Sequence, residues 1–131
     1  MIFIDSNVPM YLVGAPHPNK DRAVAVLTQL VRNEERFVTD VEVYQEILHR
    51  YTAIQRLDAI DAAFESLDAL VDDTLSFDMT EVRIARDLIT SVNGISARDA
   101  LHVAVMIRAD VSRIFSFDRG FDAFPGIDRL D

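Results

Sequence analysis

Residues 1–7 read Met1-Ile2-Phe3-Ile4-Asp5-Ser6-Asn7, a run of large apolar side chains that stops at an acidic residue. Such a run, too short for a helix, is typical of a buried β-strand. A second run of this kind, Ser112–Phe117, stops at Asp118. Between the two runs, helical and extended patterns alternate, and this alternation indicates the fold class.

Amphipathic segments separate short extended runs along the chain. The predicted strands are Met1–Ile4, Arg36–Val38, Thr74–Phe77, Ser112–Phe117 and a candidate edge strand at Ile127–Leu130. The predicted helices are Asp21–Asn33, a helix opened by a Thr39/Glu42 capping box and ending near Gln55, Asp58–Val71, Glu81–Val92, and Ala97–Ala109 with Ser96 as its N-cap. Because helices separate the strands, we expect parallel pairing with helices on both faces of the sheet. We predict a three-layer α/β/α sandwich with a central parallel sheet, built by residues 1–131 as a single domain.

The composition excludes several classes of protein. The chain has 131 residues, of which 50% are hydrophobic, so it is large enough for one full core. It has no cysteine, which rules out disulfide scaffolds, thiolate metal sites and thiol nucleophiles. The first apolar run is too short for a signal peptide, and no run approaches the roughly 18 apolar residues of a membrane helix. We therefore expect a soluble cytoplasmic protein that does not bind membranes.

The charge balance limits how this protein would bind a polyanion. The formal net charge is −9, and Lys20 is the only lysine. Such a surface does not favour broad, counterion-releasing contact with nucleic acid. A polyanionic substrate would need local arginines or bound metal ions to offset the repulsion.

Two acidic residues follow predicted strands directly. Asp5 and Asp118 would lie at the carboxyl ends of their strands, where ligands bind in parallel sheets. For either residue alone, a helix N-cap is the simpler interpretation. If the two strands are neighbours, however, the two carboxylates would repel each other unless a divalent cation lay between them.

Three further side chains have a local pattern that leaves two interpretations open. Asp99 opens the most hydrophobic helix, where it either joins a buried site or sits exposed in the first turn, favoured by the helix dipole. Asp122, one helical turn after Asp118, either joins the acids or faces water. His102 can share a helix face with Asp99, although a hydrogen-bonded core histidine is the commoner arrangement.

Periodicity alone predicts that Glu46 is solvated. It falls nearly opposite the apolar stripe of its helix, as do Glu42, His49 and Arg50. The stripe consists of Val41, Tyr44, Ile47, Leu48, Tyr51 and Ile54.

Four segments together resemble the PIN domain family, with the closest likeness to the VapC-type toxins of toxin–antitoxin modules. They are Ile2-Phe3-Ile4-Asp5-Ser6-Asn7, Val43-Tyr44-Gln45-Glu46-Ile47-Leu48, Ser96-Ala97-Arg98-Asp99-Ala100-Leu101 and Ile114-Phe115-Ser116-Phe117-Asp118-Arg119-Gly120-Phe121. The size and the strand–helix order also match from end to end. The resemblance implies an endoribonuclease that depends on Mg²⁺ or Mn²⁺.

The resemblance also assigns roles to individual residues. It implies that an acidic pocket of catalytic, metal-binding carboxylates consists of Asp5, Glu46, Asp99 and Asp118, with Asp122 as a less certain member. Asn7 and Ser116 match small polar positions that would orient the carboxylates. Arg98 and Arg119, each adjacent to a proposed ligand, are candidate contacts for RNA phosphates, and a surface ion pair is the alternative for each. Gly120 stands where many relatives have a polar residue, so the outer edge of the pocket departs from the family pattern.

The family likeness further implies partners. These are an RNA substrate, a second copy in a homodimer and a cognate antitoxin protein. The amphipathic helices Val41–Gln55 and Asp58–Val71 are candidate walls of an antitoxin groove, and ordinary core packing is the alternative.

Two other functions remain open. A haloacid-dehalogenase-like phosphatase needs a second Asp two residues after the first and a late lysine, but here Asn7 takes that place and Lys20 is early. A non-catalytic PIN-like binding module would keep the fold without the activity.

Overall fold

A single five-stranded sheet forms the centre of the molecule. The computed structural model describes residues 1–131, and every pair of neighbouring strands in it is parallel. The strands are β1 (Ile2–Ile4), β2 (Phe37–Asp40), β3 (Asp73–Leu75), β4 (Arg113–Phe115) and β5 (Asp128–Leu130). They lie in the order β3-β2-β1-β4-β5. The predicted parallel sheet, including its candidate edge strand, is confirmed.

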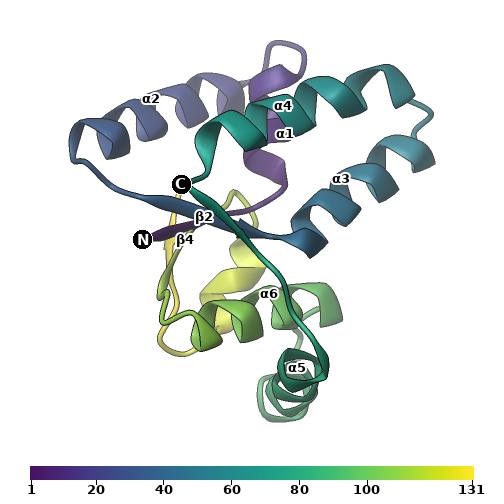
Figure 1. Ribbon diagram of the computed structural model, residues 1–131, viewed down its shortest axis with the longest axis vertical. Coiled ribbons are helices and arrows are strands. Elements are labelled where there is room, and N and C mark those ends of the chain that lie inside the picture. Colours follow the sequence, from purple (N-terminus) through teal and green to yellow (C-terminus); the bar gives the residue numbers. More distant parts are fainter.

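Helices cover both faces of this sheet. They are α1 (Asn7–Val13), α2 (Pro18–Arg32), α3 (Val41–Ala53), α4 (Ile60–Leu70), α5 (Met79–Ser91) and α6 (Ala97–Arg108), with short 3-10 turns η1 (Leu57–Ala59) and η2 (Arg119–Ala123). Figure 1 shows α1 to α4 on one side of the strands and α5 with α6 on the other. This arrangement confirms the predicted three layers. None of the helices is both long and apolar enough to cross a membrane.

At the central strand β1, the order in which the chain adds strands to the sheet reverses. Strand β1 pairs with β2 on one side and β4 on the other, so the chain builds outward from β1 in both directions. In open parallel sheets, ligands bind at the carboxyl ends of the strands beside such a point. The backbone N–H of Asp5 still donates to the carbonyl of Phe115, 3.1 Å away. Asp5 is thereby fixed at the junction of β1 and β4.

The hydrophobic core surrounds β1 and β4. Phe3 and Phe115 in the strands, Phe121 in η2 and Met106 in α6 are fully buried. Helix α6 contributes six buried residues, more than any other helix. The buried strands and α6 provide a rigid base for the side chains that follow them.

Several predicted element boundaries are wrong by one or a few residues. Thr39 belongs to β2, where its hydroxyl donates to the carbonyl of Ile4 at 2.9 Å, so it is not the N-cap of α3. Asp40 takes that role instead, with its Oδ1 accepting from the backbone N–H of Val43 at 2.9 Å. Strand β4 ends at Phe115 and not at Phe117, because β5 pairs with it only as far as Phe115.

Strand β3 and helix α5 also begin earlier than predicted. Pairing with β2 sets β3 at Asp73–Leu75, two residues short of Phe77. A capping box between Asp78 and Glu81 then opens α5.

Candidate functional site

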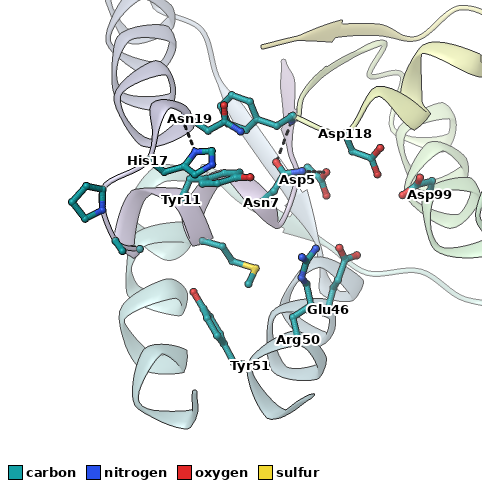
Figure 2. A pocket seen from close by; sticks show the side chains of 15 residues that line it. Asp5, Asn7, Tyr11, His17, Asn19, Glu46, Arg50, Tyr51, Asp99 and Asp118 are labelled. Atoms are coloured by element: carbon teal, nitrogen blue, oxygen red, sulfur yellow. Dashed lines mark hydrogen bonds between the residues drawn. The ribbon is translucent and has the colours of Figure 1, made fainter. Parts of the chain in front are cut away.

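Four acidic side chains from four different elements line one cleft of about 550 Å³. Asp5 follows β1, Glu46 lies in the second turn of α3, Asp99 lies in the first turn of α6, and Asp118 is the N-cap of η2. Figure 2 shows Asp5 between Glu46 on one side and Asp99 with Asp118 on the other. Because α3 and α6 cover opposite faces of the sheet, these carboxylates meet only at its carboxyl edge.

Asp5 is the most buried of the four, with only 4% of its surface exposed. Its Oδ1 accepts from the backbone N–H of Ser6 at 2.8 Å. Its Oδ2 accepts from the hydroxyl of Ser116 at 2.5 Å and from the amide of Asn7 at 3.1 Å. Burial raises the pKa of Asp5 above its ordinary value, against the opposing effects of His102 and the Ser116 hydrogen bond.

Ser116 also links Asp5 to the segment that carries Asp118. Its hydroxyl oxygen accepts from the backbone N–H of Asp118 at 3.0 Å and from the Asn7 amide at 3.2 Å. Asn7 in turn accepts from the backbone N–H of Phe117 through its side-chain oxygen at 3.3 Å. Asn7 and Ser116 therefore connect the ends of β1 and β4 and fix the orientation of the Asp5 carboxylate.

Glu46 is held from two sides. Its Oε1 accepts from the hydroxyl of Ser6 at 2.6 Å, and its Oε2 lies 3.4 Å from Nε2 of His102. Burial on its own would raise the pKa of Glu46, but hydrogen bonds from His102 and Ser6 outweigh it and lower the pKa. Glu46 is therefore held ionised beside Asp5, although its sequence periodicity predicted a solvated residue.

His102 lies beneath Glu46 and is fully buried. Its Nδ1 is 2.8 Å from Oδ2 of Asp40, so each ring nitrogen faces a carboxylate. Burial on its own would lower the pKa of His102, yet the hydrogen bonds to Asp40 and Glu46 raise it well above its ordinary value. An imidazolium in this position donates to both carboxylates and has no lone pair left for a metal ion.

The participation of Asp40 was missed from the sequence. Asp40 is fully buried, and besides capping α3 it is the partner of His102. The signal was present, because Asp40 ends a strand as Asp5 does. The sequence does not reveal the role of Asp40, because the predicted capping box places the N-cap one residue too early, at Thr39.

Asp99 and Asp118 form the more open part of the site. Burial and repulsion from Asp118 and Asp5 raise the pKa of Asp99 to about 6. Asp118 is exposed, and its Oδ1 accepts from the backbone N–H of Gly120 at 2.8 Å. A Cβ atom on Gly120 would lie 3.2 Å from Oδ2 of Asp99 and 3.1 Å from Oδ1 of Asp118. The absence of a side chain at this position therefore leaves room for both carboxylates.

The donor set fits a hard divalent cation. Ligand atoms of Asp5, Glu46 and His102 all lie within 4.8 Å of one another, and both nitrogens of His102 already face carboxylates. The donors that remain are carboxylate oxygens, the ligands that Mg²⁺ and Mn²⁺ prefer. Burial, followed by repulsion from Asp118 and Asp5, raises the pKa of Asp99, and a bound cation would relieve that repulsion. The carboxylate oxygens of Asp5 and Glu46 thus suit a hard cation, and Asp99 and Asp118 line the same cleft.

Three other residues of the sequence hypothesis lie outside this cleft. Asp122 is bound to Arg129 at 2.8 Å, which lowers the pKa of Asp122. Arg98 lies on α6 with its Nε 3.4 Å from Glu42 and 3.9 Å from Glu46. Arg119 is exposed on η2, and its side chain does not line the cleft.

Comparisons with known proteins agree with this fold. The sequence matches the family described as PIN domain over residues 2–127. It is 53% identical over 130 residues to a Mycobacterium tuberculosis protein named Ribonuclease VapC13, with 99% of each chain covered.

Two solved structures have a similar fold. The structure of VapBC2 from Rickettsia felis, bound to a DNA fragment from their promoter, gives a TM-score of 0.74 at 13% identity and covers 99% of this chain and 98% of that one. The structure of Mycobacterium tuberculosis VapC20, described as a sarcin-ricin loop cleaving toxin, gives a TM-score of 0.70 at 19% identity and covers 94% of each chain. At these identities the likeness concerns the fold alone.

Proposed function

Since this chain belongs to the PIN domain family, we propose that it is a metal-dependent endoribonuclease that acts as the toxin of a type II toxin–antitoxin pair. The observation that carries the proposal is the convergence of four carboxylates at the carboxyl edge of the sheet. The name of the relative at 53% identity, a ribonuclease, supports the choice of RNA as the substrate.

The proposed metal ligands are Asp5, Glu46, Asp99 and Asp118, and the proposed ion is Mg²⁺ or Mn²⁺. Such an ion, when bound, activates a water for attack on the phosphodiester and neutralises the charge that develops on the phosphate. The chain's own groups orient the ligands: Ser116 and Asn7 hold Asp5, while Ser6 and His102 hold Glu46. Pre-oriented ligands reduce the cost of assembling the site around its ion.

The serines and the lysine near the cleft are not set up as covalent nucleophiles. The hydroxyls of Ser6 and Ser116 both donate to carboxylates, and Lys20 donates to the carbonyl of Gly14 at 2.9 Å. Hydrolysis by an activated water needs no such nucleophile. The arrangement therefore favours direct hydrolysis of RNA.

An antitoxin and a second copy of this chain are the proposed protein partners. Similar solved structures are described as VapBC2 and VapBC-1, in agreement with a toxin that is held by a partner protein. Leu48 on α3 and Ile54 at its C-cap are large, exposed apolar residues of the predicted wall Val41–Gln55, and exposed Leu57 lies between the two predicted walls. They are suited to pack against an antitoxin segment, since exposed apolar side chains in proximity mark interaction surfaces.

The test is RNA cleavage by the purified protein with Mg²⁺ or Mn²⁺ and with excess EDTA. We expect cleavage with either ion, none with EDTA, and a loss of at least about 100-fold in Asp5→Asn. Asp110→Asn is the matched control, because Asp110 is exposed beyond the far end of α6 and its positive φ of 56° suits asparagine. Cleavage in EDTA, or equal cleavage by Asp5→Asn and Asp110→Asn, would contradict the proposal.

A further inference from the structure

The cleft extends well beyond the four carboxylates. Its other end is lined by α1, by the loop that leads to α2, and by the last turns of α3. Figure 2 shows Tyr11, His17 and Asn19 on one wall and Arg50 with Tyr51 on the wall opposite, with Asp5 and Glu46 between them and the other acids. These walls are aromatic, uncharged or cationic, whereas the other end is acidic.

Tyr11 forms a supported aromatic surface in this part of the cleft. Its ring packs edge-on against Phe117 at a centroid distance of 5.3 Å, and the imidazole of His17 lies 4.9 Å away with an interplanar angle of 33°. Tyr11 is only half-buried, and the rest of its ring faces the cleft. A ring held on two sides loses little conformational freedom when a flat ligand stacks on it.

The loop that carries His17 is fixed in place. Lys20 donates to the carbonyl of Gly14 at 2.9 Å, and Nδ1 of His17 accepts from the backbone N–H of Asn19 at 3.0 Å. A Cβ atom on Gly14 would lie 2.9 Å from the carbonyl oxygen of Met10, so the turn at the end of α1 requires glycine. The wall behind Tyr11 is therefore a built surface.

Arg50 is the only arginine or lysine among the residues that line the cleft. Its guanidinium is exposed and forms no ion pair or hydrogen bond within the chain, although Glu46 lies one helical turn before it. Arg98 and Arg129, by contrast, are both paired with carboxylates. In a protein of net charge −9, an unpaired arginine beside an acidic site is a strong local attraction for a phosphate.

We propose that this end of the cleft binds one unpaired nucleotide of the RNA strand, with its base stacked on Tyr11 and a neighbouring phosphate held by Arg50. The proposal rests on the proposed function, because the acidic end is where the strand would be cut. Stacking on an aromatic side chain requires a base that is free of its duplex partners. The site therefore selects a single-stranded or looped segment as the substrate.

Binding is measured in an Asp5→Asn background, so that the result does not depend on whether the protein cleaves RNA. The probe is a short fluorescein-labelled single-stranded RNA, followed by fluorescence anisotropy. We expect Tyr11→Leu to weaken binding about ten-fold and Tyr11→Phe to restore it, because the phenyl ring keeps the stacking surface. Leucine retains much of the apolar contact with Phe117, and the Phe variant separates loss of stacking from loss of fold.

An abasic scan locates the stacked base. In the protein that keeps Tyr11, removing the base at one position of the RNA should weaken binding about ten-fold. In Tyr11→Leu, the same removal should have little further effect. Additive losses at every position would overturn the stacking assignment.

Arg50→Gln has a matched control in Arg32→Gln. Both arginines are exposed, unpaired basic residues in the last turn of a helix, Arg50 in α3 and Arg32 in α2, so both variants lose the same net charge and the same helix-dipole contact. We expect Arg50→Gln alone to weaken binding and to reduce the slope of log affinity against log salt by about 1. Equal effects of the two variants would mean that Arg50 acts only through net charge.

Two outcomes separate the possible failures. If Tyr11→Leu and Arg50→Gln bind RNA normally but lose the antitoxin, this end of the cleft is a protein-docking site and the proposal is wrong. If both variants lose RNA binding, and the unmodified protein, which keeps Asp5, cleaves no RNA, the proposed hydrolysis is wrong and the proposed nucleotide site stands.

Discussion

The two parts of the acidic site are built differently. Asp5 and Glu46 each receive hydrogen bonds from side chains of other segments, and both are largely buried. Asp99 and Asp118 have no such donors from other segments, and repulsion between them helps to raise the pKa of Asp99. The first pair is oriented by the fold itself, whereas the second pair would need the proposed cation to offset its repulsion.

The largest expected effect comes from breaking the oriented pair. His102→Gln removes the cation between Asp40 and Glu46 and leaves two carboxylates without their charged partner. We expect the free energy of unfolding, measured by urea denaturation, to fall by about 3 kcal/mol. His49→Gln, an exposed substitution on α3, is the control. A change of similar size in both variants would contradict a special role for His102.

A smaller effect is expected from loosening Asp5 without removing it. Ser116→Ala deletes a hydroxyl that donates to Asp5 and accepts from the backbone of Asp118. We expect Mn²⁺ affinity, measured by calorimetric titration, to fall about 10- to 100-fold, as is usual when a group behind a metal ligand is removed. Ser112→Ala, on the exposed approach to β4, should bind Mn²⁺ like the unmodified protein. Unchanged affinity in Ser116→Ala would show that the fold of β1 alone orients Asp5.

The smallest expected effect is the pH dependence of stability that Asp99 causes. Its pKa of about 6 in the folded protein lies above its ordinary value of 3.8, so the folded state binds more protons than the unfolded state between these values. The contribution of Asp99 to stability therefore falls as pH rises from about 4 to about 6, and it stays low above that range. Without metal, Asp99→Asn should raise the Tm by a few degrees at pH 7.5 and by less at pH 4.5.

Added Mn²⁺ provides the check on this sign. The ion should raise the Tm of the unmodified protein at pH 7.5, since it binds the folded state only. It should raise that of Asp99→Asn much less. A lower Tm of Asp99→Asn at pH 7.5 without metal would contradict the repulsion between Asp99 and Asp118.

The sequence predicts most of the fold because most of the elements carry a local signal. Apolar runs ending at Asp5 and near Asp118 indicated two strands, and the alternation with helices indicated parallel pairing. The boundary at Thr39 was off by one residue. A hydroxyl that bonds across two strands and one that caps a helix have the same appearance in the sequence.

Glu46 shows why the site was harder to predict than the fold. The helix α3 buries Val43, Ile47 and Tyr51, so its buried face includes two residues of the predicted stripe but is rotated towards Val43, which the stripe does not contain. Tyr44 instead packs on Phe64 of α4, with ring centroids 4.9 Å apart, so apolar residues of α3 serve two different neighbours. Glu46 therefore lies beside the buried face, at a position that only the tertiary arrangement of α3 and α6 defines. Family resemblance, and not periodicity, pointed to Glu46.

The hydrogen bond from the backbone of Asp5 to Phe115 extends the hydrogen bonding of the sheet by one residue into the acidic cleft. Opening that amide to solvent would mean separating the two innermost strands, which is close to unfolding the whole molecule. A regulator could therefore not displace Asp5 by a small local movement of the backbone. Whatever silences such a protein has to obstruct its entrance from outside or dismantle it altogether.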